Sequence, residues 1–202
     1  MASKIIVDQL EKSGLTALTL PTGNATANQY IKNDGAGALS WATLPSSGKV
    51  LRVIHVNKDD EWTVTGTTMT DITGMAATIT PTAATSKILV MITVNAGGSN
   101  TATHFNLRTF RDAVQIAMGA ASGSRSRHTA TTAQSTHNTT TVSMNWLDEP
   151  TIPATPIAIT YKLQASANNA GQPVYINRTT TNTDNTSYAI TVSSITLMEI
   201  GA

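Results

Sequence analysis

Residues 86–95 read Ser-Lys-Ile-Leu-Val-Met-Ile-Thr-Val-Asn, and this stretch contains the longest apolar run of the chain. Half of its residues have β-branched side chains, which favour an extended backbone. A short apolar run without strict alternation is typical of a central strand that is covered on both faces. The run is also too short to cross a bilayer as a helix. The stretch therefore predicts the central strand of a β-sheet.

Short strand-like segments lie on both sides of this run. The chain has 202 residues, of which 36 are threonine and only 12% are charged, a composition that suits strands better than long exposed helices. The other apolar or β-branched segments between turn residues are 50–56, 75–80, 104–111, 114–118, 142–147, 157–163, 174–176, 188–192 and 195–200. The first of them, residues 50–56, has the composition of a buried strand. The pattern predicts an all-β domain over residues 49–202, either an antiparallel sandwich or a barrel.

The first 48 residues carry a weaker pattern. Residues 29–42 predict a β-hairpin around Asn-Asp-Gly-Ala-Gly at 33–37, because these residue types tolerate the positive φ of tight turns. Residues 4–13 fit either a helix or an extended segment, and we favour the extended one. An isolated hairpin is only marginally stable in water. Residues 1–48 are therefore expected to form an attachment and stem segment that packs against the following domain or against copies of itself, with the boundary at residues 45–48.

A set of short motifs is spread over most of the chain. It comprises the hairpin pattern Gln-x-x-Lys-x-Asp-Gly-x-Gly-x-Leu-x-Trp at residues 29–41, residues 78–82 leading into 85–90, residues 123–127, residues 161–164 with 174–178, and the ending 193–200. This set resembles tail fibres and other appendage proteins of bacteriophages, especially marine ones. The resemblance implies a jelly-roll head similar to TNF/C1q-like domains, and it is the reason to prefer a jelly roll over an immunoglobulin-like sandwich. It also implies a homotrimer whose residues 1–48 attach to other virion proteins.

The function that this resemblance implies is structural rather than enzymatic. The chain would be a virion protein of a tailed phage, assembled in the host cytoplasm, that forms a trimeric fibre or knob. Its head would contact a glycan or receptor on the host surface. Three alternatives stay open: a capsid decoration protein (head fibre), a monomeric carbohydrate-binding module, and a depolymerase that cleaves host glycans.

Charge and composition argue against several other classes of protein. Thirteen Lys and Arg residues face twelve Asp and Glu residues, so the chain lacks the excess of cations by which nucleic-acid-binding proteins neutralise phosphates. No apolar segment is long enough for insertion into a membrane as a helix. There is no cysteine, the four histidines lack metal-ligand spacing, and no nucleotide-binding fingerprint occurs. We therefore expect no disulfide, no metal and no cofactor.

The candidate binding residues combine charge or an aromatic ring with expected exposure. Arg125, Arg127 and His128 concentrate positive charge in a Ser/Thr/Ala-rich stretch. This segment could bind an anionic surface glycan, or it could be a solvated strand end or pair with acidic groups across a subunit boundary. Trp62 and Trp146 stand beside carboxylates and could stack on sugar rings. Arg178 completes the set of surface or interface candidates.

Two further patterns fit more than one interpretation. The carboxylates at residues 59–61 and 148–149 lie next to indoles and could form the acid pair of a glycoside hydrolase, or they could be turn residues. Because the carboxylates of the chain are few and scattered, we favour turns and expect no catalysis. The polar run 129–141 could be an exposed loop at the outer tip, or a Thr-rich strand packed against its equivalents around a threefold axis.

Overall fold

A computed structural model describes residues 9–10, 14, 16–44, 48–98, 104–133 and 137–201. The chain divides into two compact units, residues 1–46 and residues 47–202, which we call the stem and the head. Every regular element in the described part of the chain is a β-strand, and this confirms the all-β prediction. No helix in that part is long and apolar enough to span a bilayer.

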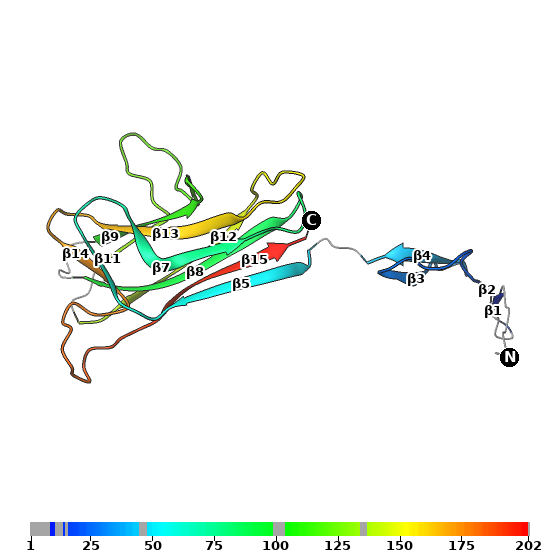
Figure 1. Ribbon diagram of the computed structural model, residues 1–202, viewed down its shortest axis with the longest axis horizontal. Coiled ribbons are helices and arrows are strands. Elements are labelled where there is room, and N and C mark those ends of the chain that lie inside the picture. The colour runs from blue at the N-terminus through cyan, green and yellow to red at the C-terminus, as the bar shows by residue number, and fades with distance from the viewer. Residues whose placement is uncertain are drawn as a thin grey trace. The chain divides into compact units, whose positions relative to one another are not determined.

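The head is a sandwich of two sheets that pack face to face (Figure 1). The first sheet contains β5 (Val50–Lys58), β6 (Trp62–Thr65), β8 (Lys87–Gly98), β12 (Thr140–Asp148), β14 (Pro173–Ile176) and β15 (Ser193–Ile200). The second sheet contains β7 (Thr70–Ile79), β9 (His104–Arg111), β10 (Val114–Ile116), β11 (Ala130–Ala133) and β13 (Ile159–Ala167). The prediction for residues 104–111 matches β9 at both ends.

Four antiparallel pairs define the topology of the sandwich. Strand β5 pairs with β15, β7 with β13, β8 with β12, and β9 with β11. The eight strands of these pairs are, in chain order, β5, β7, β8, β9, β11, β12, β13 and β15. The pairs join the first of these strands to the last, the second to the seventh, the third to the sixth and the fourth to the fifth. The chain is thus one long hairpin rolled into two sheets, which is the jelly-roll arrangement. The structure confirms the predicted jelly roll.

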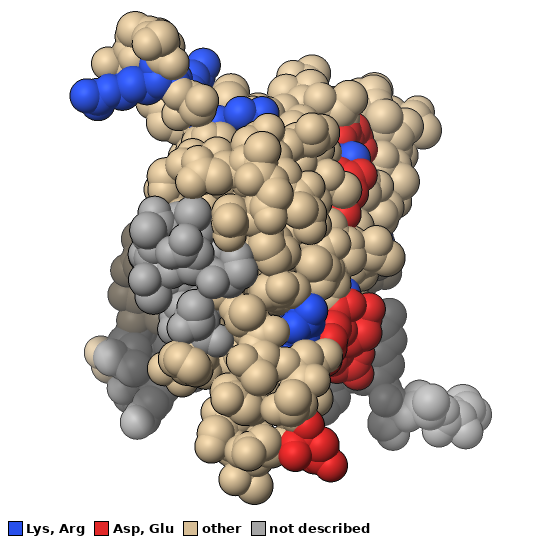
Figure 2. All heavy atoms as spheres, turned by 90° about the vertical axis from the view of Figure 1, so that its left-hand side faces the viewer, with Lys and Arg blue, Asp and Glu red and all other residues tan. Residues whose placement is uncertain are grey.

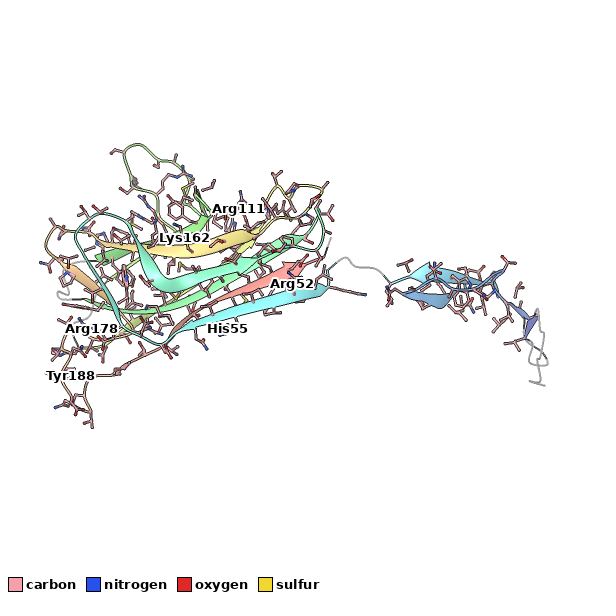
Figure 3. The ribbon with its side chains drawn as sticks, viewed as in Figure 1. Arg52, His55, Arg111, Lys162, Arg178 and Tyr188 are labelled. Carbon is pink, nitrogen blue, oxygen red and sulfur yellow. The ribbon has the colours of Figure 1, made fainter. Side chains whose placement is uncertain are left out.

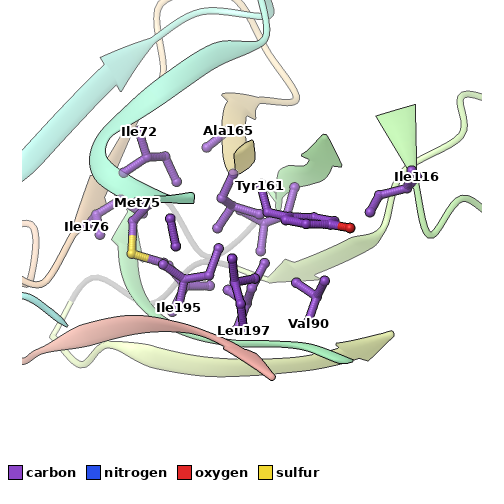
Figure 4. Close-up of a cluster of buried hydrophobic side chains, with 14 of the residues drawn as sticks. Ile72, Met75, Val90, Ile116, Tyr161, Ala165, Ile176, Ile195 and Leu197 are labelled. Carbon is purple, nitrogen blue, oxygen red and sulfur yellow. The ribbon is translucent and has the colours of Figure 1, made fainter. Parts of the chain in front are cut away.

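The core lies between the two sheets and is built from alternate residues of each strand. In β8 the side chains at positions 88, 90, 92, 94 and 96 are all buried. Figure 4 shows Tyr161 and Ala165 of the second sheet above Val90, Ile195 and Leu197 of the first. Each fully buried aliphatic side chain contributes about 1.5–3 kcal/mol, so this layer is the main source of stability.

Four details of the head differ from the sequence-based expectation. Strand β8 has only one face in the core, because its outward residues Leu89 and Met91 stay partly exposed. Strand β5 is an edge strand rather than a buried one, and its Val53 is 52% exposed. Residues 188–192 form no strand beyond an isolated bridge of Ile190. Strand β6 was not expected as a strand. Of the two interpretations of the polar run, a loop or a Thr-rich strand, residues 130–133 form a strand, β11, which pairs with β9.

A buried polar cluster joins the two sheets near one end. Arg111 of β9 donates from Nη1 to both carboxylate oxygens of Asp148, at 3.0 and 2.8 Å, and Tyr161 Oη donates to Asp148 Oδ2 at 2.7 Å. Asp148 ends β12 of the first sheet, whereas the other two residues belong to the second sheet. Burial, then the hydrogen bond to Asp148 and the negative charge of that residue, raise the pKa of Tyr161, so the phenol stays protonated as a donor. The cluster therefore clamps one sheet to the other.

The stem contains two small antiparallel pairs, β1 (Gln9–Leu10) with β2 (Leu18–Thr19) and β3 (Gln29–Asn33) with β4 (Leu39–Thr43). In the turn between β3 and β4, Asp34 Oδ1 accepts hydrogen bonds from the amides of Ala36 and Ala38 at 2.8 and 3.0 Å. None of the described stem residues is buried. Most of the segment 4–13, for which an extended state is favoured over a helix, lies outside the described residues.

We predict that Asp148→Asn lowers the free energy of unfolding by roughly 2–4 kcal/mol, because it leaves the half-buried Arg111 without a negative partner. Urea titration followed by tryptophan fluorescence measures the change. The matched control is Glu149→Gln at the next position, whose ion pair with Lys87 is exposed and contributes less than about 0.5 kcal/mol after solvent screening. Equal losses in both variants would contradict the clamp.

Candidate binding surfaces of the head

The outer face of the first sheet carries a continuous apolar row. Met198 of β15 stands opposite Val53 of β5 on one side and opposite Leu89 of β8 on the other. Leu89 in turn stands opposite Leu147 of β12. The neighbouring residues of each strand point into the sandwich, so these four side chains share the face away from the core. Val53 and Leu147 are 52% and 47% exposed. We call these four residues the apolar row.

The apolar row lies toward one end of the sheet and is flanked by polar rows. Leu51 and Met91, both exposed, extend it on either side. Further along the sheet the outward residues become polar, with Ser194 opposite Thr93 and Thr93 opposite Ser143. The apolar end is where the head begins and ends, because Gly48 N donates to Gly201 O at 2.6 Å. A contiguous exposed apolar patch with a polar rim is typical of a protein interaction surface.

Several charged and polar groups on this face pair with one another. The ring nitrogens of His55 lie 2.7 Å from Thr196 Oγ1 and 2.8 Å from Asn57 Oδ1. Lys87 Nζ lies 2.6 Å from Glu149 Oε1. The face therefore presents apolar area beside groups whose partners come from the same chain.

The outer face of the second sheet is polar instead. Asp71 of β7 accepts from Gln164 Nε2 and pairs with Lys162 Nζ, each at 2.7 Å. Lys162 also lies over the ring of Phe110, 5.9 Å from its centroid. These charges are satisfied within the sheet, and Figure 3 shows Lys162 on this side of the head.

A cavity of about 360 Å³ opens on this polar face, bounded by β9, β11, the end of β13 and the loop after β10. Its lining includes His104 and Arg108 of β9, together with His128 of the loop. Arg108 Nε donates to His128 Nδ1 across 3.4 Å. No Asp or Glu occurs among the lining residues in the described part of the chain. The cavity is therefore polar and biased toward positive charge; we call it the basic cavity.

The charge state of His128 follows from its surroundings. Burial, and then the positive charges of Arg108 and His104, lower its pKa below the ordinary value of 6.5. The neutral ring accepts the Arg108 hydrogen bond at Nδ1, which assigns its own proton to Nε2. At neutral pH the permanent charge of the basic cavity thus comes from Arg108.

The basic segment expected from the sequence lies on the loop that forms one wall of this cavity. His128 lines the basic cavity, whereas Arg125 and Arg127 are exposed and line an adjoining hollow of about 350 Å³. Figure 2 shows Lys and Arg atoms on the loop that projects at the top of that view, with Asp and Glu atoms elsewhere. The sequence did not single out Arg108 or His104, since only the pairing of β9 with β11 brings them to this loop.

The three other candidate residues lie apart from the basic cavity. Trp62 of β6 is half-buried and packs against the core, so its ring is not free to stack on a ligand. Trp146 is 45% exposed on β12. Arg178 stacks on Tyr175 at 3.8 Å and pairs with Glu61 at 3.1 Å. Figure 3 places Arg178 and Tyr188 at the end of the head away from Arg52.

Four of the five carboxylates beside the two indoles are engaged in ion pairs. Asp60 pairs with Lys58, Glu61 with Arg178, Asp148 with Arg111, and Glu149 with Lys87. Each of these four carboxylates therefore has a cationic partner from the same chain. Among the described residues, no group of three or more His, Asp or Glu side chains is close enough to hold a metal ion.

Comparisons with known proteins return distant structural likenesses. No protein-family model and no curated protein matches the chain. Among solved structures, T=1 particles derived from infectious bursal virus match 96% of this chain at 14% identity and a TM-score of 0.41. The Gx strain of infectious bursal disease virus matches 95% at 13% identity and a TM-score of 0.39. The chain spans 44% and 45% of those chains, and likeness at this level carries no argument about function.

We predict that His128 titrates below 6.5 and that Arg108→Gln raises its pKa, because one of the two positive charges beside it is removed. Two-dimensional NMR of the imidazole protons measures both values. Since the unfolded chain takes up this proton first, folding stability should fall as pH drops through about 6.5 and level off below the folded pKa. Arg125→Gln removes an equal charge outside the basic cavity, and an equal rise in that variant would contradict the assignment.

Proposed function

We propose that the head is a non-enzymatic structural domain that assembles with identical copies through the outer face of its first sheet. The observation that carries this proposal is the apolar row, which crosses four strands and in the single chain is exposed at Val53 and Leu147 and half-buried at Leu89 and Met198. Burial of apolar surface is the dominant favourable term in protein association. A second copy is a suitable occupant because Lys87 and Glu149, the described ion pair on this face, already neutralise each other, so an identical face would meet a paired charge there.

The sequence of β8 supports the same proposal. Its run of Ile, Leu, Val and Met has the composition of a strand covered on both faces, yet the core covers only one. Leu89 and Met91 stand on the other face. Their apolar character has a physical reason if a neighbouring subunit covers them. The number of subunits, three, comes from the resemblance to phage appendage proteins.

The stem supports assembly for a different reason. Its hairpin has no buried side chain among the described residues, and Leu10, Tyr30, Ile31 and Leu44 are exposed. A two-stranded hairpin of this kind needs further packing to be stable. We infer that residues 1–48 are held by copies of themselves and by other virion proteins.

These features favour a virion structural protein, and we propose a trimeric fibre or knob of a tailed phage whose head contacts the host surface. A capsid decoration protein would share every feature described above. Locating the chain in an electron-microscopy map of the virion separates a tail position from a capsid position. The exposed Trp146 would suit a third candidate, a monomeric carbohydrate-binding module. This candidate differs from the two kinds of virion protein in its mass in solution, which would be that of a single chain.

We predict that the full chain is a trimer of about three times 21.2 kDa and that Val53→Glu shifts it toward monomer, because a charge would be buried in the apolar row. Native mass spectrometry measures the change, and Leu147→Glu is an independent variant of the same row. Val114→Glu is the matched control, since Val114 is 56% exposed on β10 of the other sheet.

The control variant should stay trimeric. A wild-type chain that runs as a monomer would overturn self-association altogether. A Val114→Glu variant that dissociates as fully as Val53→Glu would move the interface away from the first sheet.

A further inference from the structure

We propose that the basic cavity binds the anionic group of a charged sugar, a carboxylate or phosphate carried on a hexose-like ring. The inference concerns a surface that self-association does not use. It rests on the proposed function in one respect, namely that the protein would meet such a sugar on the envelope of a host cell. The site itself can be tested on the isolated chain.

The cationic groups of the cavity come from two separate elements. His104 and Arg108 are four residues apart on the outward face of β9, and His128 lies beside them on the loop. Pairing of β9 with β11 at Leu107–Ala130 fixes the distance between strand and loop. The backbone amide of Thr129 also donates to Leu107 O at 2.9 Å. The three groups are therefore held together by main-chain hydrogen bonds.

The charge balance of the cavity favours an anion. Asp71, an acid on the outer face of the same sheet, is already engaged by Lys162 and Gln164. No carboxylate lines the cavity among the described residues, so the charge of Arg108 has no acidic partner there. A planar guanidinium recognises carboxylate and phosphate groups by paired hydrogen bonds, which makes these the favoured anions.

The rest of the lining suits the hydroxyl groups of a sugar. Asn106, Ser126, Thr131, Ser166 and Asn168 offer amide and hydroxyl groups around the cationic centre. The volume of about 360 Å³ is at the lower end of the range of about 300–1,000 Å³ for small-molecule sites. A single charged sugar unit fits this combination better than a bare ion, because a bare ion would leave most of the polar lining unused.

Binding of an anion should be coupled to a proton on His128. In the free cavity Nδ1 of His128 accepts from Arg108, which requires a neutral ring. The charged and titratable groups that face this ring are Arg108 and His104 from β9, while Arg125 and Arg127 belong to its own loop. The residues that β11 and β13 contribute to the lining are neutral. An anion placed among these cations favours the imidazolium form, so the ligand and the proton should bind cooperatively.

Isothermal titration calorimetry on the full chain tests the site at about pH 5.5 and about pH 7.5, on either side of the histidine range. The probes are glucuronate and glucose 6-phosphate, with glucose as the neutral control and acetate and inorganic phosphate as bare anions. We expect a charged sugar to bind and glucose not to bind. Affinity should be at least about threefold higher at the lower pH, and the bare anions should bind about tenfold more weakly. The charged sugar that binds more tightly shows whether the cavity prefers a carboxylate or a phosphate.

Matched variants assign the binding to this cavity. Arg108→Gln on β9 should weaken binding about tenfold, whereas Arg125→Gln on the loop of His128 should leave it within about twofold. In the wild-type chain, NMR titration should show the pKa of His128 rising when the charged sugar is added, a readout that needs no variant to fold. Binding of glucose equal to glucuronate, equal losses in both variants, or an unmoved His128 would overturn the proposal. A chain that binds the sugar as a monomer would overturn the trimer and leave this site standing.

Discussion

Strand β8 is the element on which the rest of the head depends. Its backbone is hydrogen-bonded along both edges, to β12 on one side and to β15 and then β14 on the other. A buried backbone group without a partner is costly, so a strand in the middle of a sheet requires neighbours over its whole length. Because the side chains of β8 alternate between the core and the outer face, a slip of one residue against either neighbour would turn Ile88, Val90 and Ile92 outward. The hydrophobic effect thus sets the register of three other strands.

Buried polar groups determine how the ends of the two sheets are positioned, which the non-directional hydrophobic effect does not specify. At one end Asp148 joins β12 to Arg111 and Tyr161 of the opposite sheet. In the first sheet Asn177, just after β14, donates from Nδ2 to the backbone oxygens of Lys58 and Asp60 and accepts from Ser193 Oγ. Such groups are stable in the interior only when they are bonded, so each of them admits few alternative packings.

The long, apolar strands of the fold could be predicted from the sequence, and the short polar ones could not. Strand β9 has a clear alternation and was predicted with the right bounds, whereas β6 and β11 contain Thr and too few apolar residues to stand out. Residues 188–192 alternate as a strand would, but Ile190 is 70% exposed, because no neighbouring strand covers this segment. The alternation of apolar and polar residues within a segment does not reveal whether a neighbouring strand is present to pair with it.

The same limit applies to the candidate sites. The Arg125–His128 segment is contiguous, so the sequence shows it as a concentration of charge. Arg108 and His104 join it only through the pairing of β9 with β11, a contact between residues about twenty positions apart. The apolar row is spread over four strands that begin at residues 50, 87, 140 and 193, and no window of sequence contains it. Its face and that of the basic cavity belong to different sheets, so the surface that would be covered by another subunit is separate from the one that would meet a ligand. Assembly through the first sheet would therefore leave the basic cavity accessible, and each property can be lost by substitution without the other.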